Sequence, residues 1–475
     1  WLWRLVPAEF MLVSSAVSFP VSAQTSSVSA QASSVSAQEL TQEVVPARFR
    51  LGPSVGFAGN YNRVEGVPLM VGPYLQRNGS NPFRLDAQVV WRSERRIGTD
   101  DKALGYRVEA QQRWGDSTVV VVGGTFHSLI SPVENRDITD LESSLSTFFA
   151  HQDFRDYFDR TGFGAFVGVE GLDPRLDIRM EYLDEDHDFV PPGTPLTLRD
   201  NEGAWRAQPL VGTGRVRTVS AEAVFDDRDR PGDPDNGWYL SGRITAAVGG
   251  SINLAEYAEY MEAAPAPEAP VAAARPIGTS FRSGSLDVRR YFRIGRSMSV
   301  RLRGVLAGSL DGEPLPPQFQ HALGGLGSLP GYAALSVDCG ARSRLYSVFH
   351  GESPETSRVP AYAGYGCDRS ALFQIEYGGR IPIGIVVDPD PDVFVDDPGL
   401  PPILDFRPRW SVFFDAGQGW SMSEPGDPDF LGPDTDFLMD LGAGFSMGPL
   451  GLYWAWPLTG EDRKGNLFLR LAHRF

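Results

Sequence analysis

Two groups of residues have the types and spacing of catalytic groups. Gly444–Gly448 matches the G-x-S-x-G pattern around a serine nucleophile, here Ser446. That motif works on a strand-to-helix turn, whereas these residues end a strand-like run that leads into a tight hairpin, so we interpret the match as chance. Glu376 and Asp415 have the chemistry of a general acid and base, but no histidine or serine partner is identifiable beside them. We therefore predict no enzymatic activity, with an esterase that uses Ser446 as a remote alternative.

A glycine-rich stretch lies between two strand-like runs in the C-terminal third. Gly324, Gly325, Gly327 and Gly331 precede Tyr332. This composition indicates a loop tip whose backbone has positive φ or lies close to another part of the protein. The tyrosine at its end gives the tip a side chain that can pack. An ordinary flexible loop is the alternative, and the flanking strands favour a packed tip.

The two cysteines, Cys339 and Cys367, follow this stretch. A bridge between them would close a loop of about 28 residues and contribute ~3–4 kcal/mol in the chain-entropy model, which suits an oxidising compartment. Two free thiols are the alternative. The acidic run 388–397 has carboxylates that suit calcium, but its alternating prolines favour a solvated turn. No metal and no cofactor is predicted.

The composition narrows the class of protein. The chain has 475 residues, a formal net charge of −17 and 42% hydrophobic residues. Downstream of the N-terminal region no apolar run reaches about 18 residues, which excludes a spanning helix there; strands of a membrane barrel need only ~9–11 alternating residues each. The negative net charge leaves no basic patch to bind phosphates, which argues against nucleic acid as a partner.

The first 45 residues have the composition of targeting and linker sequence. Arg4, the mostly apolar stretch 10–21 and a small-x-small site before Gln24 resemble a secretory signal peptide over residues 1–23. Val-Ser-Ala-Gln recurs at 21, 28 and 35, which indicates a low-complexity linker over residues 24–45. We expect the folded domain over residues 46–475.

From Phe49 onward the hydrophobic period is two. Apolar residues alternate with charged ones in segments such as 83–92, 174–184 and 297–309. A soluble sandwich also alternates in this way. Mixed-sign charge on the polar face, the number of such segments and the secretion signal instead favour an all-β fold, a transmembrane antiparallel β-barrel in the bacterial outer membrane.

Turn residues divide this domain into about sixteen strands. Short turns alternate with long connections, as an even-stranded barrel with long extracellular loops requires, although the long turn 381–408 departs from this pattern. Within the first long connection, Leu141, Leu145, Phe148 and Phe149 have helical spacing, which predicts a helix packed against the barrel mouth or a functional lid. The predicted strands are 48–61, 67–77, 83–92, 104–114, 117–127, 162–171, 174–184, 214–225, 237–249, 280–293, 297–309, 370–380, 409–416, 436–447, 450–457 and 465–475.

Together these motifs resemble the bacterial surface antigen superfamily of outer-membrane assembly factors, which includes the barrel-assembly insertase and two-partner secretion transporters. The turn with Asp226, Arg228 and Asp229 is similar to the aspartate-arginine turn of that superfamily, and 324–332 to its loop-six tip. The resemblance covers 215–475 and, more weakly, the chain from residue 46. It implies that Glu376 and Asp415 hold an arginine of that loop inside the lumen.

Two departures from the superfamily pattern bear on function. Pro330 occupies the position of the loop arginine, and proline cannot make charge-assisted bonds to the carboxylates, so Arg342 or Arg344 substitutes or the loop is not locked. The superfamily's insertases place periplasmic peptide-binding (POTRA) domains before the barrel, and we expect none here, because only about 20 residues separate the predicted signal from the first strand.

The last residues alternate as an outer-membrane strand does. Leu467, Leu469, Leu471 and Phe475 form one face, which looks like the C-terminal signal by which such barrels are recognised for insertion. His473 departs from this apolar face, and near the interface its polar tip would reach headgroups. A plain terminal strand is the alternative.

Two functions compete for a barrel of this kind. The first is an accessory in membrane-protein assembly or translocation, and the second is a passive or gated pore; an outer-membrane esterase is the remote third. Gly52, Pro53 and Gly56 weaken the ladder of the first strand, which favours a seam that opens. The expected partners are outer-membrane lipid and unfolded outer-membrane proteins or other subunits.

Overall fold

The computed structural model describes most of the domain after residue 47. The described residues are 48–135, 138–199, 205–206, 208–209, 211–253, 280–295, 297–337, 339, 345–349, 358–362, 366–381, 408–422, 437–448, 450–460 and 464–475. The predicted signal peptide (1–23), the linker (24–45) and the acidic run 388–397 lie outside these residues.

One antiparallel sheet of sixteen strands makes up the fold, as predicted. Neighbours in the sheet follow chain order, because each strand returns beside the one before it. The strands are β1 (Arg48–Phe57), β2 (Pro68–Asn78), β3 (Phe83–Arg92), β4 (Leu104–Trp114), β5 (Val119–Pro132), β6 (Tyr157–Asp173), β7 (Leu176–Asp188), β8 (Thr213–Asp226), β9 (Gly237–Asn253), β10 (Arg282–Ile294), β11 (Met298–Ser309), β14 (Arg369–Arg380), β15 (Pro408–Trp420), β16 (Leu438–Met447), β17 (Leu450–Pro457) and β18 (Asn466–Arg470).

Other regular elements lie in the connections. A separate pair, β12 (Leu345–Phe349) and β13 (Arg358–Tyr362), forms a two-stranded sheet between β11 and β14. The helix α1 (Asp140–Ala150) connects β5 to β6, and short 3-10 turns occur at Asp101–Ala103 and Pro317–Phe319. The helix confirms the prediction made from its apolar spacing.

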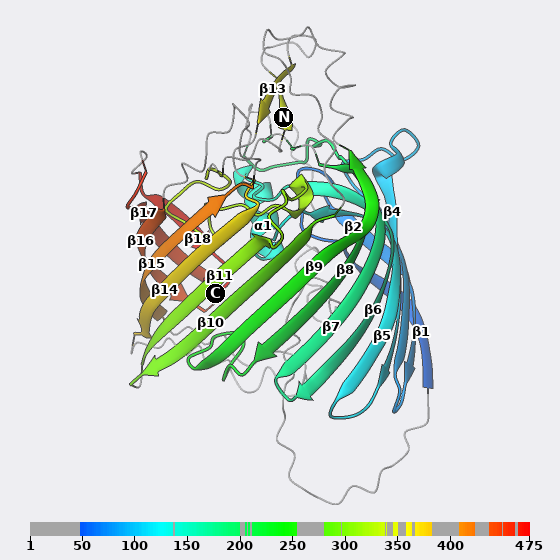
Figure 1. Ribbon diagram of the computed structural model, residues 1–475, viewed down its shortest axis with the longest axis horizontal. Coiled ribbons are helices and arrows are strands. Elements are labelled where there is room, and N and C mark those ends of the chain that lie inside the picture. The colour runs from blue at the N-terminus through cyan, green and yellow to red at the C-terminus, as the bar shows by residue number, and fades with distance from the viewer. Residues whose placement is uncertain are drawn as a thin grey trace, which may run out of the picture.

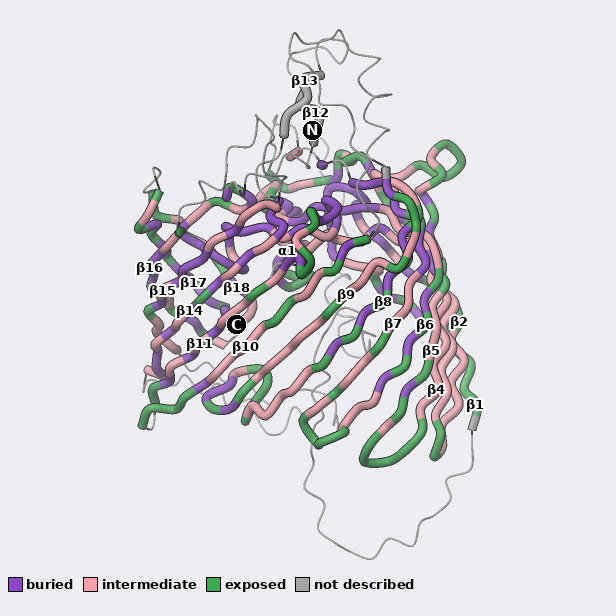
Figure 2. The backbone as a smooth tube through the Cα atoms, in the orientation of Figure 1, coloured by how far each residue is buried: buried purple, intermediate pink, exposed green. Residues whose placement is uncertain are grey.

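The two faces of the sheet have the reverse of a soluble protein's polarity. On β11, Arg301 and Arg303 are almost fully buried while Leu306 is 58% exposed. On β14, Gln374 and Glu376 are buried while Phe373 is 46% exposed. Figure 2 shows buried and exposed segments alternating along many strands. The polar face therefore lines the interior and the apolar face points outward, as in a membrane barrel.

The sheet curves into a barrel without closing. In Figure 1 it runs from β1 on the right, through β7 to β10 in front, to β16 and β17 on the left. Among the described residues β1 pairs only with β2 and β18 only with β17. We call the gap between β1 and β18 the seam. No described helix is long and apolar enough to cross a membrane.

The last strand is shorter than predicted. β18 ends at Arg470, so the prediction of one strand over 465–475 was wrong. Leu467 and Leu469 are exposed on the outer face, but Phe475 is buried. Residues 471–475 leave the sheet because Arg474 pairs with Asp415 and His473 faces Asp233 inside the barrel, and among the described residues no ladder joins them to β1.

Candidate functional site

The long connection after β11 is fixed at its base by a disulfide. The sulfurs of Cys339 and Cys367 are bonded, with their Cα atoms 5.1 Å apart. Both residues are fully buried and pack against Leu323 and Val337. The bridge thus ties the far side of the loop tip to the residues just before β14.

The loop tip is compact, as its glycines predicted. Gly324 and Gly325 have φ of 87° and 86°, which side chains rarely allow. The Gly325 amide donates to the carbonyls of Leu329 and Tyr332 at 3.0 and 3.1 Å. These bonds close the nine-residue stretch on itself, so the tip is a folded unit.

The tip lies against the inner face of the sheet. The Gly331 amide donates to Oδ2 of Asp440 on β16 at 2.7 Å, and a Cβ at Gly331 would come within 2.6 Å of the Asp440 Cβ. The Tyr332 hydroxyl lies 2.9 Å from the Met439 carbonyl and 2.8 Å from that of Thr459. Only glycine permits so close an approach. Because the tip contacts Asp440 on the inner face of the sheet, the loop is folded into the lumen, as predicted.

Inward side chains of two further strands hold the same tip. On β18, Asn466 donates to the carbonyls of Pro330 and Gly331 at 3.1 and 2.9 Å. On β14, Gln374 donates to the Ser328 carbonyl at 2.8 Å. The tip therefore links β14, β16 and β18 from inside.

Beside the tip lies a cluster of buried carboxylates. Asp415 on β15 is paired in register with Asp440 on β16, and both are fully buried. Glu376 on β14 is also buried. Like charges directly opposite each other destabilise a sheet, so these carboxyl groups can all be ionised only with a cation beside them. The sequence analysis named Glu376 and Asp415 but missed Asp440, which only the register places opposite Asp415.

The cation is Arg474. Its guanidinium forms an ion pair with Asp415, lies 3.9 Å from Glu376, and stacks with its Cζ 3.5 Å from the ring centre of Phe413. The expected substitutes, Arg342 and Arg344, lie outside the described residues. Thus an arginine of the last residues occupies the place that the resemblance assigns to a loop arginine. Its signal in the sequence was that Arg470 and Arg474 alternate with the apolar residues at the end of the chain.

The aspartate-arginine turn between β8 and β9 is built around its own ion pair. Arg228 binds both carboxylate oxygens of Asp226, at 2.8 and 2.7 Å, and its Cζ lies 4.7 Å from the ring centre of Tyr239. Asp229 accepts the amides of two later residues of the turn, at 3.0 and 3.2 Å. Although burial raises the pKa of Asp229, these amides together with Arg230 and Arg293 outweigh it and hold the pKa below its usual value.

The same turn also reaches the last residues of the chain. Asp233 lies 2.8 Å from Arg301, 2.9 Å from Arg409 and 3.6 Å from His473. Burial raises the pKa of Asp233, but His473 and the two arginines lower it further, so it stays below its usual value. The predicted placement of His473 towards headgroups was wrong, because its side chain faces this carboxylate. Burial, followed by Arg301, lowers the pKa of His473.

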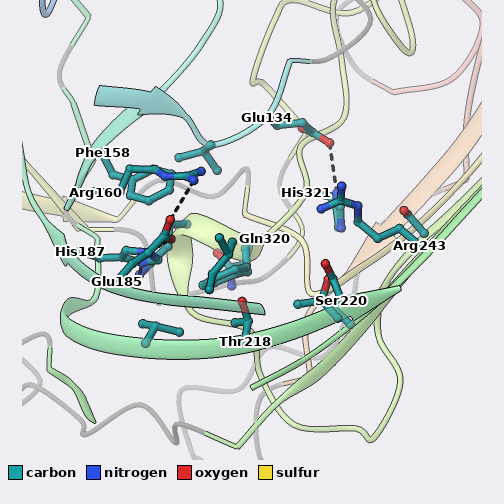
Figure 3. A pocket seen from close by; sticks show the side chains of 18 of the residues that line it. Glu134, Phe158, Arg160, Glu185, His187, Thr218, Ser220, Arg243, Gln320 and His321 are labelled. Carbon is teal, nitrogen blue, oxygen red and sulfur yellow. Dashed lines mark hydrogen bonds and ion pairs between the residues drawn. The ribbon is translucent and has the colours of Figure 1, made fainter. Parts of the chain in front are cut away.

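A polar cavity of about 300 Å³ lies in the barrel beside the start of the loop. In Figure 3, Arg160 faces Glu185 at one side and His321 faces Glu134 at another, with distances of 2.8 and 3.1 Å. Hydroxyl groups, such as that of Ser220, line the wall between them. Within the described part of the chain no group of three or more histidine, cysteine or acidic residues is placed to hold a metal.

The G-x-S-x-G residues lack the structural context of a nucleophile. Ser446 lies at the end of β16, opposite Arg409 on β15 and Gly451 on β17. The chain then turns at Gly448, with φ of 60°, into β17 and not into a helix. A nucleophile elbow requires a strand-to-helix turn, so the pattern is not an elbow here.

These features define a sixteen-stranded antiparallel β-barrel fold with a loop folded into its lumen and an open seam. No protein-family model matches the chain, and no curated protein matches it. Among solved structures it is similar to BamA from Haemophilus ducreyi lacking POTRA domains 1–3, with 12% identity over 88% of this chain and 70% of that chain, at a TM-score of 0.46.

Two further similar structures are CdiB proteins. CdiB from Escherichia coli is 12% identical over 88% of this chain and 62% of that chain, at a TM-score of 0.38. CdiB from Acinetobacter baumannii is 9% identical over 89% and 64%, at a TM-score of 0.34. The chain thus spans less than two thirds of either CdiB.

Proposed function

We propose that this protein is an integral outer-membrane β-barrel of the assembly-factor superfamily and acts as an accessory in membrane-protein assembly or translocation. The observation that carries the proposal is the seam, where the edges of β1 and β18 have no ladder between them among the described residues. A pore requires a closed wall, whereas an insertase requires a lateral opening. An unpaired edge presents backbone groups to which another strand can bond.

The outer surface supports a membrane location. Leu450, Leu452, Trp454 and Trp456 are exposed in succession on β17, and buried residues alternate with them. Similar exposed apolar residues occur on strands around the sheet. A soluble protein does not expose apolar area on this scale, so lipid is the partner that this face fits. This apolar outer face and the predicted signal peptide together support the bacterial outer membrane as the proposed location.

Cross-linking the seam tests the proposal. Val55 on β1 and Leu469 on β18 are both exposed on the outer face. A Val55→Cys/Leu469→Cys variant, reconstituted in vesicles, is treated with a bifunctional thiol reagent, and insertion of an unfolded outer-membrane barrel is timed. We expect the open protein to accelerate insertion over empty vesicles and the cross-linked protein to lose that gain.

The matched control joins two strands that are already paired. Met180 on β7 and Ala221 on β8 are ladder partners, so cross-linking a Met180→Cys/Ala221→Cys variant adds the same chemistry away from the seam. This control should keep its activity. If the untreated protein inserts no faster than empty vesicles, the proposed function is wrong.

A gated pore is the second candidate, and the cavity beside the loop favours it. Planar-bilayer conductance of the intact protein and of a variant lacking residues 312–366 separates the two roles of the loop. A large current only after deletion means that the loop is a plug. Equal currents mean that the loop does not obstruct the pore, and a passive channel is then the better account. Lipase activity that Ser446→Ala abolishes would revive the esterase alternative.

A further inference from the structure

The helix α1 has an unexpected orientation. Its N-terminus is fixed by a capping box, in which Thr139 accepts the amide of Glu142 and Glu142 accepts the amide of Thr139. Of the apolar residues whose spacing predicted this helix, Leu141 and Phe149 are more than half exposed. The buried residues are Glu142, Ser143 and Thr147. This helix therefore packs by its polar face, which points to specific hydrogen bonds.

One side of that polar face binds the end of β18. Oε1 of Glu142 accepts Nε of Arg470 at 2.8 Å and the amide of Leu471 at 2.7 Å. Arg470 is 1% exposed, and it also donates to the carbonyl of Leu326 in the loop tip at 3.2 Å. A buried ion pair with backbone bonds at both partners is costly to break. It fixes the end of β18, one edge of which has no ladder among the described residues.

The next residues along α1 bind the segment that follows β1. Asn60, three residues beyond the end of β1, donates to Oγ of Ser143 at 3.0 Å. The Tyr61 amide donates to Oγ of Ser144 at 2.9 Å. Consecutive residues of one helix, 142 to 144, thus touch the end of β18 and the continuation of β1.

A hydrogen bond and a buried ion pair hold the connection that carries α1 against the β1 side. Arg155 donates to Asn60 at 3.1 Å. Arg63 lies 3.2 Å from Asp153. Several contacts thus attach α1 to the β1 side, and Glu142 attaches it to the end of β18 through Arg470 and Leu471.

We propose that α1 is a latch across the seam, which holds β18 to the β1 side through Glu142 in place of a backbone ladder. Releasing Glu142 lets the seam widen, and it also removes one anchor of Arg470, which binds the loop tip. This proposal rests on the proposed function only for the kind of molecule that passes through the opened seam. The claim that α1 holds the seam together does not depend on it.

Seam width measured by pulsed electron paramagnetic resonance tests the latch. Spin labels on a Val55→Cys/Leu469→Cys protein in nanodiscs report the distance between β1 and β18 without a client. We expect Glu142→Ala to increase the fraction of long distances several-fold and Glu142→Gln to increase it less. Leu141→Ala is the matched control, since that exposed side chain lies beside Glu142 on the same helix, and it should leave the distribution unchanged.

Exchanging the charges of Glu142 and Arg470 shows whether their ion pair holds the seam. If Glu142→Arg widens the distribution and Glu142→Arg/Arg470→Glu narrows it again, the ion pair is the latch, even if either single variant folds poorly. An unchanged distribution in Glu142→Ala overturns the latch. Because no client is present, latch and function fail separately: unaltered distances with active insertion reject only the latch, and altered distances without insertion reject only the proposed function.

Discussion

Strands β6 to β9 and strands β16 to β18 belong to one sheet but are held in different ways. β6 and β9 each have 17 residues, and backbone ladders join them to both neighbours. β17 has 8 residues and β18 has 5, and the outer edge of β18 is unpaired among the described residues. Side-chain contacts from the loop tip, α1 and residues 471–475 replace the ladder there.

The comparison indicates at which positions single substitutions should destabilise this barrel most. We call the strands that are paired on both sides, β2 to β11 and β14 to β17, the wall. Their stability comes from many backbone hydrogen bonds, each worth about 0.5–1.5 kcal/mol net, so no single side chain determines it. At the seam a few buried charged groups carry the contacts, and removing one partner leaves the other buried and unpaired. Single substitutions should therefore act strongly at the seam and weakly in the wall.

The largest effect is expected at Arg474. Arg474→Gln leaves Asp415 and its carboxylate neighbours without their cation, which should cost about 3–5 kcal/mol of unfolding free energy. Urea unfolding of the refolded protein measures the loss. Adding Asp415→Asn to the variant should restore part of the stability. A wild-type unfolding curve for Arg474→Gln would mean that the ion pair does not hold residues 471–475.

The second effect is a pH dependence at the latch. Burial raises the pKa of Glu142, but the Arg470 guanidinium and the amides of Thr139 and Leu471 lower it further, so the pKa lies below its usual value. The contribution of the ionised carboxylate, about 1.5–3 kcal/mol for bonds to charged groups, is complete above the ordinary glutamate pKa of about 4.3. It is lost as pH falls from there through the folded-state pKa.

Seam width by paramagnetic resonance between pH 7 and pH 3 measures this release. Wild-type protein should widen only in the acidic part of that range, whereas Glu142→Gln should keep its smaller increase in seam width throughout, nearly independent of pH. A wild-type seam that widens around neutral pH would assign the titration to another group.

A smaller effect is expected at the loop tip. Gly331→Ala places a Cβ within 2.6 Å of the Asp440 Cβ and 2.9 Å of the Pro457 nitrogen, and such overpacking typically costs about 1–3 kcal/mol. Displacement of the tip should raise the bilayer conductance. Gly304→Ala is the control, because no atom lies within 4 Å of its added Cβ. Equal conductance in both variants would show that the tip does not depend on this approach.

The smallest effect is expected in the wall. Arg113 on β4 forms an ion pair with Glu170 on β6, and both side chains are partly exposed. Arg113→Gln should change the unfolding free energy by less than about 1 kcal/mol. A loss as large as that of Arg474→Gln would remove the contrast between wall and seam.

Local patterns in the sequence predicted the wall well. The segments predicted at 104–114 and 450–457 coincide with β4 and β17, because strand alternation and turn residues are local signals. The compact loop tip was likewise predictable from its glycines. The predicted ends were less accurate where a strand extends past its alternating core, as β5 does to Pro132.

The seam could not be predicted in the same way, because its contacts join residues that are far apart in the chain. Arg474 and Asp415 are 59 residues apart, and Arg470 and Glu142 are 328 apart. The sequence analysis expected Arg342 or Arg344 to substitute at the carboxylates, or the loop to be unlocked, whereas the structure places Arg474 beside Asp415 and Glu376. Likewise, the apolar spacing of α1 predicted a helix but not the polar face by which it packs, since contacts with residues distant in the chain decide its orientation.

Amide hydrogen exchange of the protein in nanodiscs, followed peptide by peptide, tests the central claim most directly. If side chains replace the ladder at the seam, peptides from β1 and β18 should exchange about tenfold or more faster than peptides from β7 and β8, because their outer-edge amides lack backbone partners. Equal protection of β1, β18 and the wall strands would mean that a ladder closes the barrel, and would contradict the account.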